Sequence, residues 1–242
     1  MARKEYPLAL VTGGAHRLGR AYALALARQG YAILLHYHHS VEKATTTVKE
    51  VSALGVPIHP TQADLADLMS IEALFSDLDA LPYHLKVLVN SAAIMPRAHI
   101  HTLSASDWDA AFALNLRAPF LLAQRAAKRM GDGGLIVNVT DVGAQRAWSG
   151  YPAYTVSKAA LESLTRVLAR AYAPKIRVNA IAPGLVLPSE DTSAEEWERL
   201  VDRLPLKRPA TVEEIAAALE FLLKNEYITG QTIVVDGGYS LL

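Results

Sequence analysis

Short apolar runs alternate with longer amphipathic segments along most of the chain. The runs are mostly apolar throughout, without polar residues at alternate positions, as expected for parallel strands covered on both faces. They predict strands at 7–12, 31–37, 56–60, 86–90, 134–140, 175–183 and 231–238. Apolar residues recur at helical spacing between these runs. The segments with this spacing include 18–29, 41–54, 104–130, 153–172 and 211–224.

This alternation predicts an α/β fold, a Rossmann-type doubly wound parallel sheet of about seven strands with helices on both faces. The 242 residues contain no linker rich in Pro, Gly or Ser and no repeat, so we expect a single domain, 1–242. One irregular stretch interrupts the alternation between the sixth and seventh strands. Because such insertions often cover a binding site, we expect a substrate lid at about 185–204.

Composition narrows the classes of partner. The formal net charge is zero, which gives no electrostatic reason to expect binding to nucleic acid or to an anionic membrane. There is no cysteine, so disulfides, thiolate nucleophiles and zinc–thiolate sites are excluded. The first apolar run ends at Val11, too early for a secretory signal, and no run is long enough to span a bilayer. We expect a small-molecule partner and a cytoplasmic location.

A glycine-rich loop, "TGGAHRLGR" at 12–20, joins the first predicted strand to the first predicted helix. Gly13 and Gly14 allow a tight turn, and Gly19 lets the chain pass close to a ligand where the helix begins. The helix N-terminus then offers backbone amides to a pyrophosphate, so this context predicts dinucleotide binding. Arg17, however, stands where such a loop is expected to have another glycine.

The second predicted strand ends in "HYHHS" and lacks the Asp or Glu that holds the ribose 2′-hydroxyl in sites for NAD. His36, His38, His39 and Ser40 offer hydrogen-bond donors instead, and Arg17 is within reach from the glycine loop. Donors and a cation suit a 2′-phosphate, so we predict NADPH as the cofactor. A metal site is the alternative for three neighbouring histidines, but no acidic or thiolate partner accompanies them, and we predict none.

The segment "YTVSK" places Tyr154 and Lys158 one helical turn apart, on the same face of a predicted helix. An ammonium group close to a phenol favours the phenolate and lowers the pKa of the phenol. We therefore expect Tyr154 to exchange a proton near neutral pH.

Taken together, these motifs resemble those of the short-chain dehydrogenase/reductase family over essentially the whole chain. The matching segments are "TGGAHRLG", "ADL" at 63–65, "NSAA" at 90–93, "LNLRAPF", "YPAYTVSK", "APG" at 182–184 and "YITGQTIVVDGGYSL". Within the family the chain is most similar to the pteridine reductases. Features of that branch are Arg17, "HYHHS", "GLVLPSEDTSAEEW", "DGGYSL", and Asp141 where most relatives have a catalytic serine.

The resemblance implies an NADPH-dependent reductase that converts a dihydropterin or dihydrofolate to the tetrahydro form, acting as a homotetramer. Its implied catalytic residues are Asn115, Asp141, Tyr154 and Lys158, with Asn115 helping to position a water. The implied cofactor residues are Gly13, Arg17, Leu18, Gly19, His36, Tyr37, His38, His39, Ser40, Asp64, Leu65, Asn90, Ser91, Ala92, Thr140, Tyr154, Lys158, Pro183 and Gly184. The implied substrate residues are Arg17, Met95, Asp141, Tyr151, Tyr154, Leu185 and Trp197.

One position departs from the pteridine reductase pattern. Those enzymes commonly have an aromatic residue shortly after "NSAA" to stack on the pterin, whereas this chain has Ile94 and Met95 there. A flexible, polarizable methionine can cover such a ring. Two alternatives stay open: a carbonyl or 3-oxoacyl-thioester reductase, and a catalytically silent dinucleotide-binding protein. Intact Tyr154 and Lys158 argue against the silent protein.

Overall fold

The computed structural model describes residues 6–189 and 192–242, in which seven strands form one sheet. The strand order is β3-β2-β1-β4-β5-β6-β7, and every pairing is parallel. The predicted doubly wound fold is therefore confirmed. The strands are β1 (Pro7–Val11), β2 (Ala32–Tyr37), β3 (Ile58–Gln62), β4 (His84–Asn90), β5 (Gly134–Val139), β6 (Ile176–Pro183) and β7 (Thr232–Val235).

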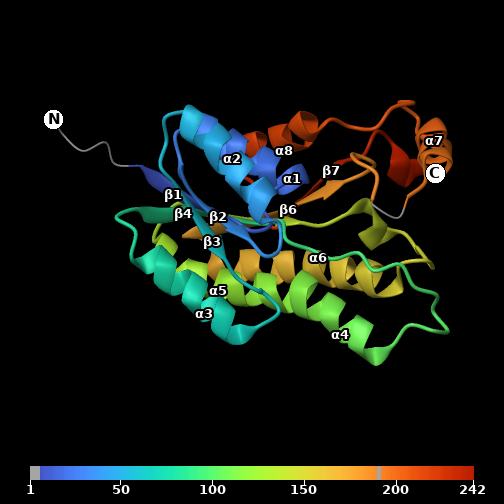
Figure 1. Ribbon diagram of the computed structural model, residues 1–242, viewed down its shortest axis with the longest axis horizontal. Coiled ribbons are helices and arrows are strands. Elements are labelled where there is room, and N and C mark those ends of the chain that lie inside the picture. Colours follow the sequence, from blue (N-terminus) through green and yellow to red (C-terminus); the bar gives the residue numbers. More distant parts are fainter. Residues whose placement is uncertain (1–5, 190–191) are drawn as a thin grey trace.

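Helices cover both faces of this sheet (Figure 1). On one face lie α1 (Arg17–Arg28), α2 (Val41–Ala53) and α8 (Val212–Lys224). On the other lie α3 (Leu68–Asp79), α4 (Ala105–Phe112), α5 (Ala118–Met130) and α6 (Pro152–Tyr172). The helix α7 (Ala194–Arg203) follows β6 and stands apart from both layers. Because the order of connections reverses between β1 and β4, a crevice is expected beyond their carboxyl ends.

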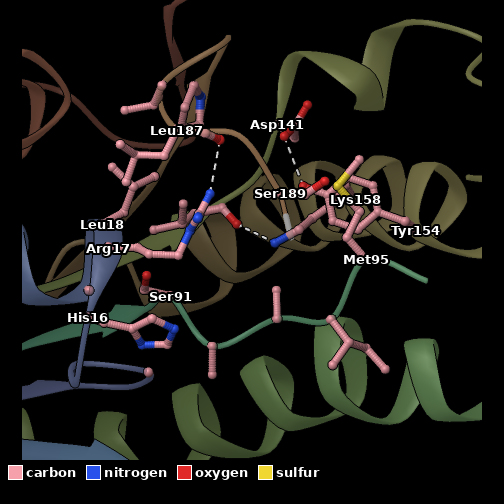
Figure 2. A pocket seen from close by; sticks show the side chains of 18 of the residues that line it. His16, Arg17, Leu18, Ser91, Met95, Asp141, Tyr154, Lys158, Leu187 and Ser189 are labelled. Atoms are coloured by element: carbon pink, nitrogen blue, oxygen red, sulfur yellow. Dashed lines mark hydrogen bonds between the residues drawn. The ribbon is translucent and has the colours of Figure 1, made fainter. Parts of the chain in front are cut away.

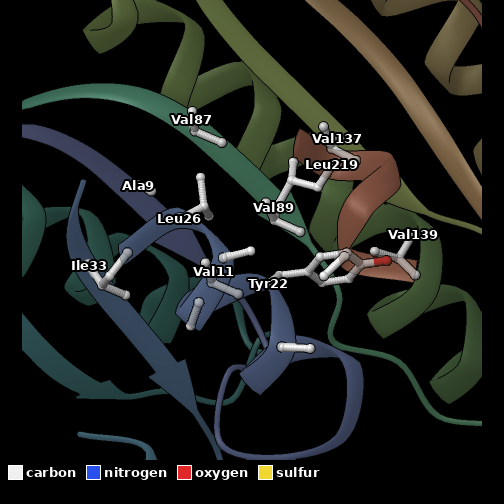
Figure 3. Packing of buried hydrophobic residues seen from close by; sticks show 14 of the residues in the cluster. Ala9, Val11, Tyr22, Leu26, Ile33, Val87, Val89, Val137, Val139 and Leu219 are labelled. Atoms are coloured by element: carbon white, nitrogen blue, oxygen red, sulfur yellow. The ribbon is translucent and has the colours of Figure 1, made fainter. Parts of the chain in front are cut away.

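The two faces of the sheet build two separate hydrophobic cores, which explains why most strand positions are apolar without alternation. In β1, Leu8 and Leu10 pack on the side of α3 and α5, whereas Ala9 and Val11 pack on the side of α1 and α8. Tyr22 of α1 is fully buried on the second side (Figure 3). Each fully buried side chain of the leucine class contributes about 1.5–3 kcal/mol.

Among residues 6–189 and 192–242, two α-helices lie outside the segments predicted from the sequence. In α3, Ile71, Leu74, Phe75 and Leu78 are buried at helical spacing, and the side chain of Asp67 accepts a hydrogen bond from the amide of Ser70 to cap the helix. The other is α7, inside the stretch 185–204 that the sequence marks as irregular. Glu190 and Asp191 of that stretch lie outside the described residues.

The predicted helix 104–130 has a break in its regular geometry. Between α4 and α5 runs a π-helical turn, η1 (Ala113–Arg117), in which Asn115 is fully buried. Such turns are rare and occur frequently at functional sites. Across residues 6–189 and 192–242, no helix is both long and apolar enough to cross a membrane.

Candidate active site

A cavity of about 700 Å³ opens beyond the carboxyl ends of the central strands. It collects the ends of β1, β2, β4, β5 and β6, the start of α6, and α7. Most residues assigned from the sequence line it: Gly13, Arg17, Leu18, Gly19, His36, Tyr37, His38, His39, Ser40, Asp64, Leu65, Ser91, Ala92, Met95, Thr140, Asp141, Tyr151, Tyr154, Lys158, Pro183, Gly184, Leu185 and Trp197.

Asn90 and Asn115, also assigned from the sequence, are buried and do not line the cavity. The Nδ2 of Asn90 donates to Oδ1 of Asn138 at 2.8 Å, which ties β4 to β5. Asn115 accepts from the amide of Ile94 and donates to its carbonyl, both at 2.9 Å, and also donates to Ser157 Oγ at 3.0 Å. The side chain of Asn115 is thus committed to holding the loop after β4.

The glycine loop is as tightly packed as a phosphate-binding turn requires. Gly13 has φ of +63°, and a Cβ there would lie 3.0 Å from Cα of Ala92. A Cβ at Gly19 would collide with the carbonyl oxygen of Gly13. These positions exclude larger side chains, and the loop leads directly into the N-terminus of α1, where a phosphate is favoured.

Arg17 adopts the backbone conformation of the glycine it replaces, with φ of +52°. Its guanidinium donates to the carbonyl oxygens of Leu187 and Pro188, each at 2.9 Å. These bonds join the glycine loop to the chain after β6, and the one to Leu187 is visible in Figure 2. Since β2 and β6 lie on opposite sides of β1 in the sheet, the guanidinium is directed away from the end of β2. The assignment of Arg17 to the cofactor stays a prediction, while its contacts in this structure are with the chain after β6.

His36 does not offer the hydrogen-bond donor that the sequence suggested. It is 2% exposed, its Nδ1 accepts from the amide of Gly13 at 3.1 Å, and its Nε2 lies 3.0 Å from the carbonyl oxygen of Ala63. Accepting at Nδ1 leaves the proton on Nε2, so both ring nitrogens are engaged within the protein. Burial lowers the pKa of His36 to about 4, and the neutral ring braces the glycine loop.

The neighbours of His36 keep the predicted position at the mouth of the cavity. The rings of His38 and His39 lie against each other with centroids 3.6 Å apart and are tilted by 33°. Ser40 precedes α2 without a side-chain capping bond to it. These three residues line the end of the cavity next to β2 with side chains that can donate hydrogen bonds.

Three of the four predicted catalytic side chains, Asp141, Tyr154 and Lys158, converge at the opposite end, between β5 and α6 (Figure 2). The carboxylate of Asp141 accepts from the amide of Gly143 at 2.7 Å and from the hydroxyl of Tyr154 at 2.8 Å. Lys158 donates to the carbonyl oxygen of Val139 at 2.7 Å, and its Nζ lies 5.7 Å from the centroid of the Tyr154 ring. The tyrosine therefore contacts the carboxylate directly.

The electrostatics of this cluster are dominated by burial. Burial raises the pKa of Asp141 to about 6, against the hydrogen bonds from Gly143 and Tyr154 and the charge of Lys158. Burial also lowers the pKa of Lys158 to about 8. The pKa of Tyr154 is raised well above its ordinary value by burial and by Asp141. The expectation that Lys158 lowers the pKa of Tyr154 is therefore wrong for this structure.

The substrate end of the cavity contains aromatic residues that the sequence did not assign. The Trp148 ring lies 6.4 Å from that of Tyr151 and 6.1 Å from that of Tyr239, centroid to centroid. Tyr239 is held by Arg146, which donates to its carbonyl oxygen and lies 4.8 Å from its ring centroid. The segment "DGGYSL" carried a signal for Tyr239, whereas nothing in the local pattern marks Trp148.

Within the described part of the chain, no group of three or more His, Cys, Asp or Glu side chains is arranged to hold a metal ion. The geometry joins a glycine loop at a helix N-terminus to a buried Tyr–Lys pair across one cavity. That combination defines a dinucleotide-dependent oxidoreductase.

Comparison with known proteins identifies the family. A family model described as enoyl-(acyl carrier protein) reductase matches residues 13–240. The chain belongs to the short-chain dehydrogenase/reductase family, whose members include NAD(P)-dependent reductases.

The names of individual relatives state different substrates. A 1-cyclohexenylcarbonyl-CoA reductase of Streptomyces collinus is 37% identical, over 97% of this chain and 87% of its own. A 3-oxoacyl-[acyl-carrier-protein] reductase FabG of Staphylococcus aureus is 35% identical, over 95% of this chain and 96% of its own. FolM alternative dihydrofolate reductase 1 from Brucella suis is 36% identical in sequence, and its crystal structure in complex with NADP superposes with a TM-score of 0.91. The match covers 98% of this chain and 96% of that chain.

Proposed function

We propose that this protein is an NADPH-dependent reductase of dihydropteridines, converting dihydropterin or dihydrofolate to the tetrahydro form. The observation that carries the proposal is the hydrogen bond of 2.8 Å between Tyr154 and Asp141, in a site where burial raises the pKa of Asp141 to about 6. The structural similarity to a FolM dihydrofolate reductase supports the same substrate class.

The cavity is suited to NADPH, which supplies a hydride to the substrate when bound. The glycine loop and the N-terminus of α1 would hold the pyrophosphate. His38, His39 and Ser40 would hold the 2′-phosphate, and Lys158 the nicotinamide ribose. The NADP in the FolM crystal structure supports this cofactor.

The protein's part of the chemistry is to deliver a proton. Reducing a C=N bond places the proton on a ring nitrogen, which is a better base than a carbonyl oxygen. Tyr154 retains its proton because burial and Asp141 raise its pKa. With a raised pKa of its own, Asp141 is protonated often enough near neutral pH to act as a proton source for this nitrogen, directly or through Tyr154.

Reduction of a 3-oxoacyl thioester is the second candidate, because the FabG relative is of similar identity. In that reaction the substrate oxygen becomes an alkoxide beside Tyr154. With a pKa of about 6, Asp141 is ionised in most molecules at neutral pH, and an ionised carboxylate bonded to the same tyrosine would repel this developing charge, whereas a neutral hydroxyl would stabilise it. The carboxylate therefore favours the pteridine.

The test is NADPH oxidation measured with dihydrobiopterin, dihydrofolate and an acetoacetyl thioester. We expect turnover with the dihydropteridines. Asp141→Ser and Tyr154→Phe should each lower kcat at least about 100-fold, the usual contribution of general acid catalysis. NADPH affinity, followed by fluorescence titration, should change little in either variant. If Asp141→Ser reduced dihydrobiopterin as fast as the parent protein, the acid role would be lost and the thioester reductase would become the better assignment.

A lid over the substrate at about 185–204 is also part of the proposal. Thr192, Glu196, Trp197 and Leu200 of this segment line the cavity, and α7 has no buried residue of its own. Such a helix can move without disrupting the core, and closing it would exclude water from the reacting groups. We also propose that the protein is a single domain and assembles as a homotetramer.

A further inference from the structure

Arg97 places a positive charge at the rim of the substrate end of the cavity. It lies in the loop after β4, two residues beyond Met95, which lines the cavity. Its guanidinium lies 5.9 Å from the ring centroid of Tyr151, and its Nη1 donates to Oε2 of Glu196 at 3.4 Å. Tyr151 and Glu196 line the cavity from the start of α6 and from α7, so Arg97 contacts one residue from each of two elements that line the site.

The backbone around Arg97 is held in place, while its side chain has room to move. The amide of Ala98 donates to the carbonyl oxygen of Gly150 at 3.0 Å, and Asn115 fixes Ile94 on the other side. The Arg97 side chain itself is 51% exposed. The loop thus presents the guanidinium at a defined place without burying it.

The partner that Arg97 has in this structure is weakly held. A single bond of 3.4 Å joins two side chains that are 51% and 33% exposed, and such pairs contribute little to stability. The other cations of the site donate to main-chain carbonyls: Arg17 to Leu187 and Pro188, Lys158 to Val139. Arg97 donates to a carboxylate, and a carboxylate on a ligand can take the place of that partner.

We propose that Arg97 forms a subsite for a carboxylate on the substrate's tail, and that the preferred substrate is therefore dihydrofolate. This inference rests on the proposed reduction of a pteridine at Asp141 and Tyr154. A folate carries a p-aminobenzoyl group and a glutamate beyond its pterin ring. The aromatic group suits the rings of Trp148 and Tyr151, and the glutamate suits the guanidinium. Dihydrobiopterin has a neutral side chain and gains nothing from Arg97.

The opposing interpretation is a latch, in which the Arg97–Glu196 pair holds α7 over any substrate. The two interpretations differ at Glu196. As a latch partner, Glu196 helps every substrate, and its loss resembles the loss of Arg97. As a neighbour of the subsite, Glu196 competes with the substrate carboxylate and repels it, so its loss favours dihydrofolate.

The experiment measures kcat/KM for dihydrofolate and for dihydrobiopterin and compares their ratio between variants. Arg97→Gln should lower the ratio about tenfold, as expected for one partly exposed charge-assisted hydrogen bond. The loss should appear in KM, because the bond forms equally in ground and transition states. Arg97→Lys should restore part of the ratio, and Glu196→Gln should raise it. Arg199→Gln, which alters an exposed arginine of α7 outside the cavity lining, is the matched control and should leave it unchanged.

Each outcome decides the matter. If Arg97→Gln and Glu196→Gln lower kcat/KM for both substrates alike, the pair is a latch and the subsite is refuted. An unchanged ratio in Arg97→Gln also refutes it. If the parent protein reduces neither substrate but reduces the acetoacetyl thioester, the proposed function fails and this inference fails with it.

Discussion

The conformation of Arg17 offers a sharp test of how the glycine loop is built. A side chain in the left-handed region costs about 1–2 kcal/mol relative to the right-handed region, whereas glycine carries no such cost. The φ of Arg17 is +52°, so the loop keeps an arginine in a backbone conformation suited to glycine. The guanidinium's two hydrogen bonds of 2.9 Å to Leu187 and Pro188 help to offset that cost.

Two substitutions separate the backbone from the side chain. Arg17→Ala and Arg17→Gly both remove the guanidinium, so the loss of its hydrogen bonds cancels in their comparison. Alanine keeps the left-handed cost of about 1–2 kcal/mol, while glycine removes it but gives the unfolded chain about 0.4–1 kcal/mol more entropy. We therefore expect Arg17→Gly to be more stable than Arg17→Ala by about 0.5–1 kcal/mol.

Urea unfolding without ligands measures this difference. At the usual sensitivity of 1–3 kcal/mol per molar urea, the midpoints should differ by roughly 0.3 M. Limited proteolysis supplies the second readout: cleavage within 185–204 should accelerate to the same extent in both variants, since both lack the anchor to Leu187 and Pro188. A stability of Arg17→Ala equal to or above that of Arg17→Gly would refute the backbone argument. Unchanged cleavage in both variants would refute the anchor.

Cofactor choice, the buried histidine, the lid and the assembly each give a further measurable outcome. NADPH should bind more tightly than NADH, and Ser40→Ala should weaken NADPH alone; equal losses in fluorescence titrations with the two cofactors would contradict the 2′-phosphate site. His36 has a folded pKa of about 4 against 6.5 unfolded, so the unfolded chain takes up the proton first, and the contribution of His36 to the free energy of unfolding should fall by up to about 3 kcal/mol from pH 6.5 down to 4. Asp141, whose pKa is raised to about 6, acts in the opposite direction, so the difference between the parent and His36→Gln isolates the histidine; a difference that does not change with pH would contradict its buried, neutral state. NADPH and dihydropterin together should protect 185–204 from protease; unchanged cleavage would make Trp197 a packing residue. Light scattering should give a tetramer, and a monomer would contradict that expectation.

The strands were predictable because the physical cause is local and repeated. Each central strand is covered on both faces, so residues such as Leu8 and Ala9 are both fully buried although they point to opposite cores. The helix α7 was harder to predict, because most helices are stabilised by packing an apolar face on the core. None of the residues of α7 is buried, and its start is set instead by Ser193, whose side chain accepts from the amide of Glu196.

The lining of the cavity was predictable for a different reason. The carboxyl ends of parallel strands meet at one edge of the sheet, so motifs distant in sequence are brought together by topology. The directions of individual side chains were not predictable. Arg17 reaches Pro188, 171 positions along the chain, and His36 turns inward to Gly13 and Ala63. Both choices depend on which carbonyls and amides the folded loops leave in reach.

The direction of the pKa shift at Tyr154 likewise depends on which groups the folded chain places near the phenol. Sequence spacing places Lys158 one turn from Tyr154 and suggests a lowered pKa, but the amine is 5.7 Å from the ring centroid and is bonded to Val139. The carboxylate of Asp141 is 2.8 Å from the phenol oxygen. Coulomb interactions weaken with distance, so the nearer carboxylate opposes ionisation more strongly than the amine favours it, and burial acts in the same direction. Tyr154 therefore stays protonated beside Asp141, whose own pKa is raised. Such a pair can supply a proton, which suits a substrate nitrogen that must gain one.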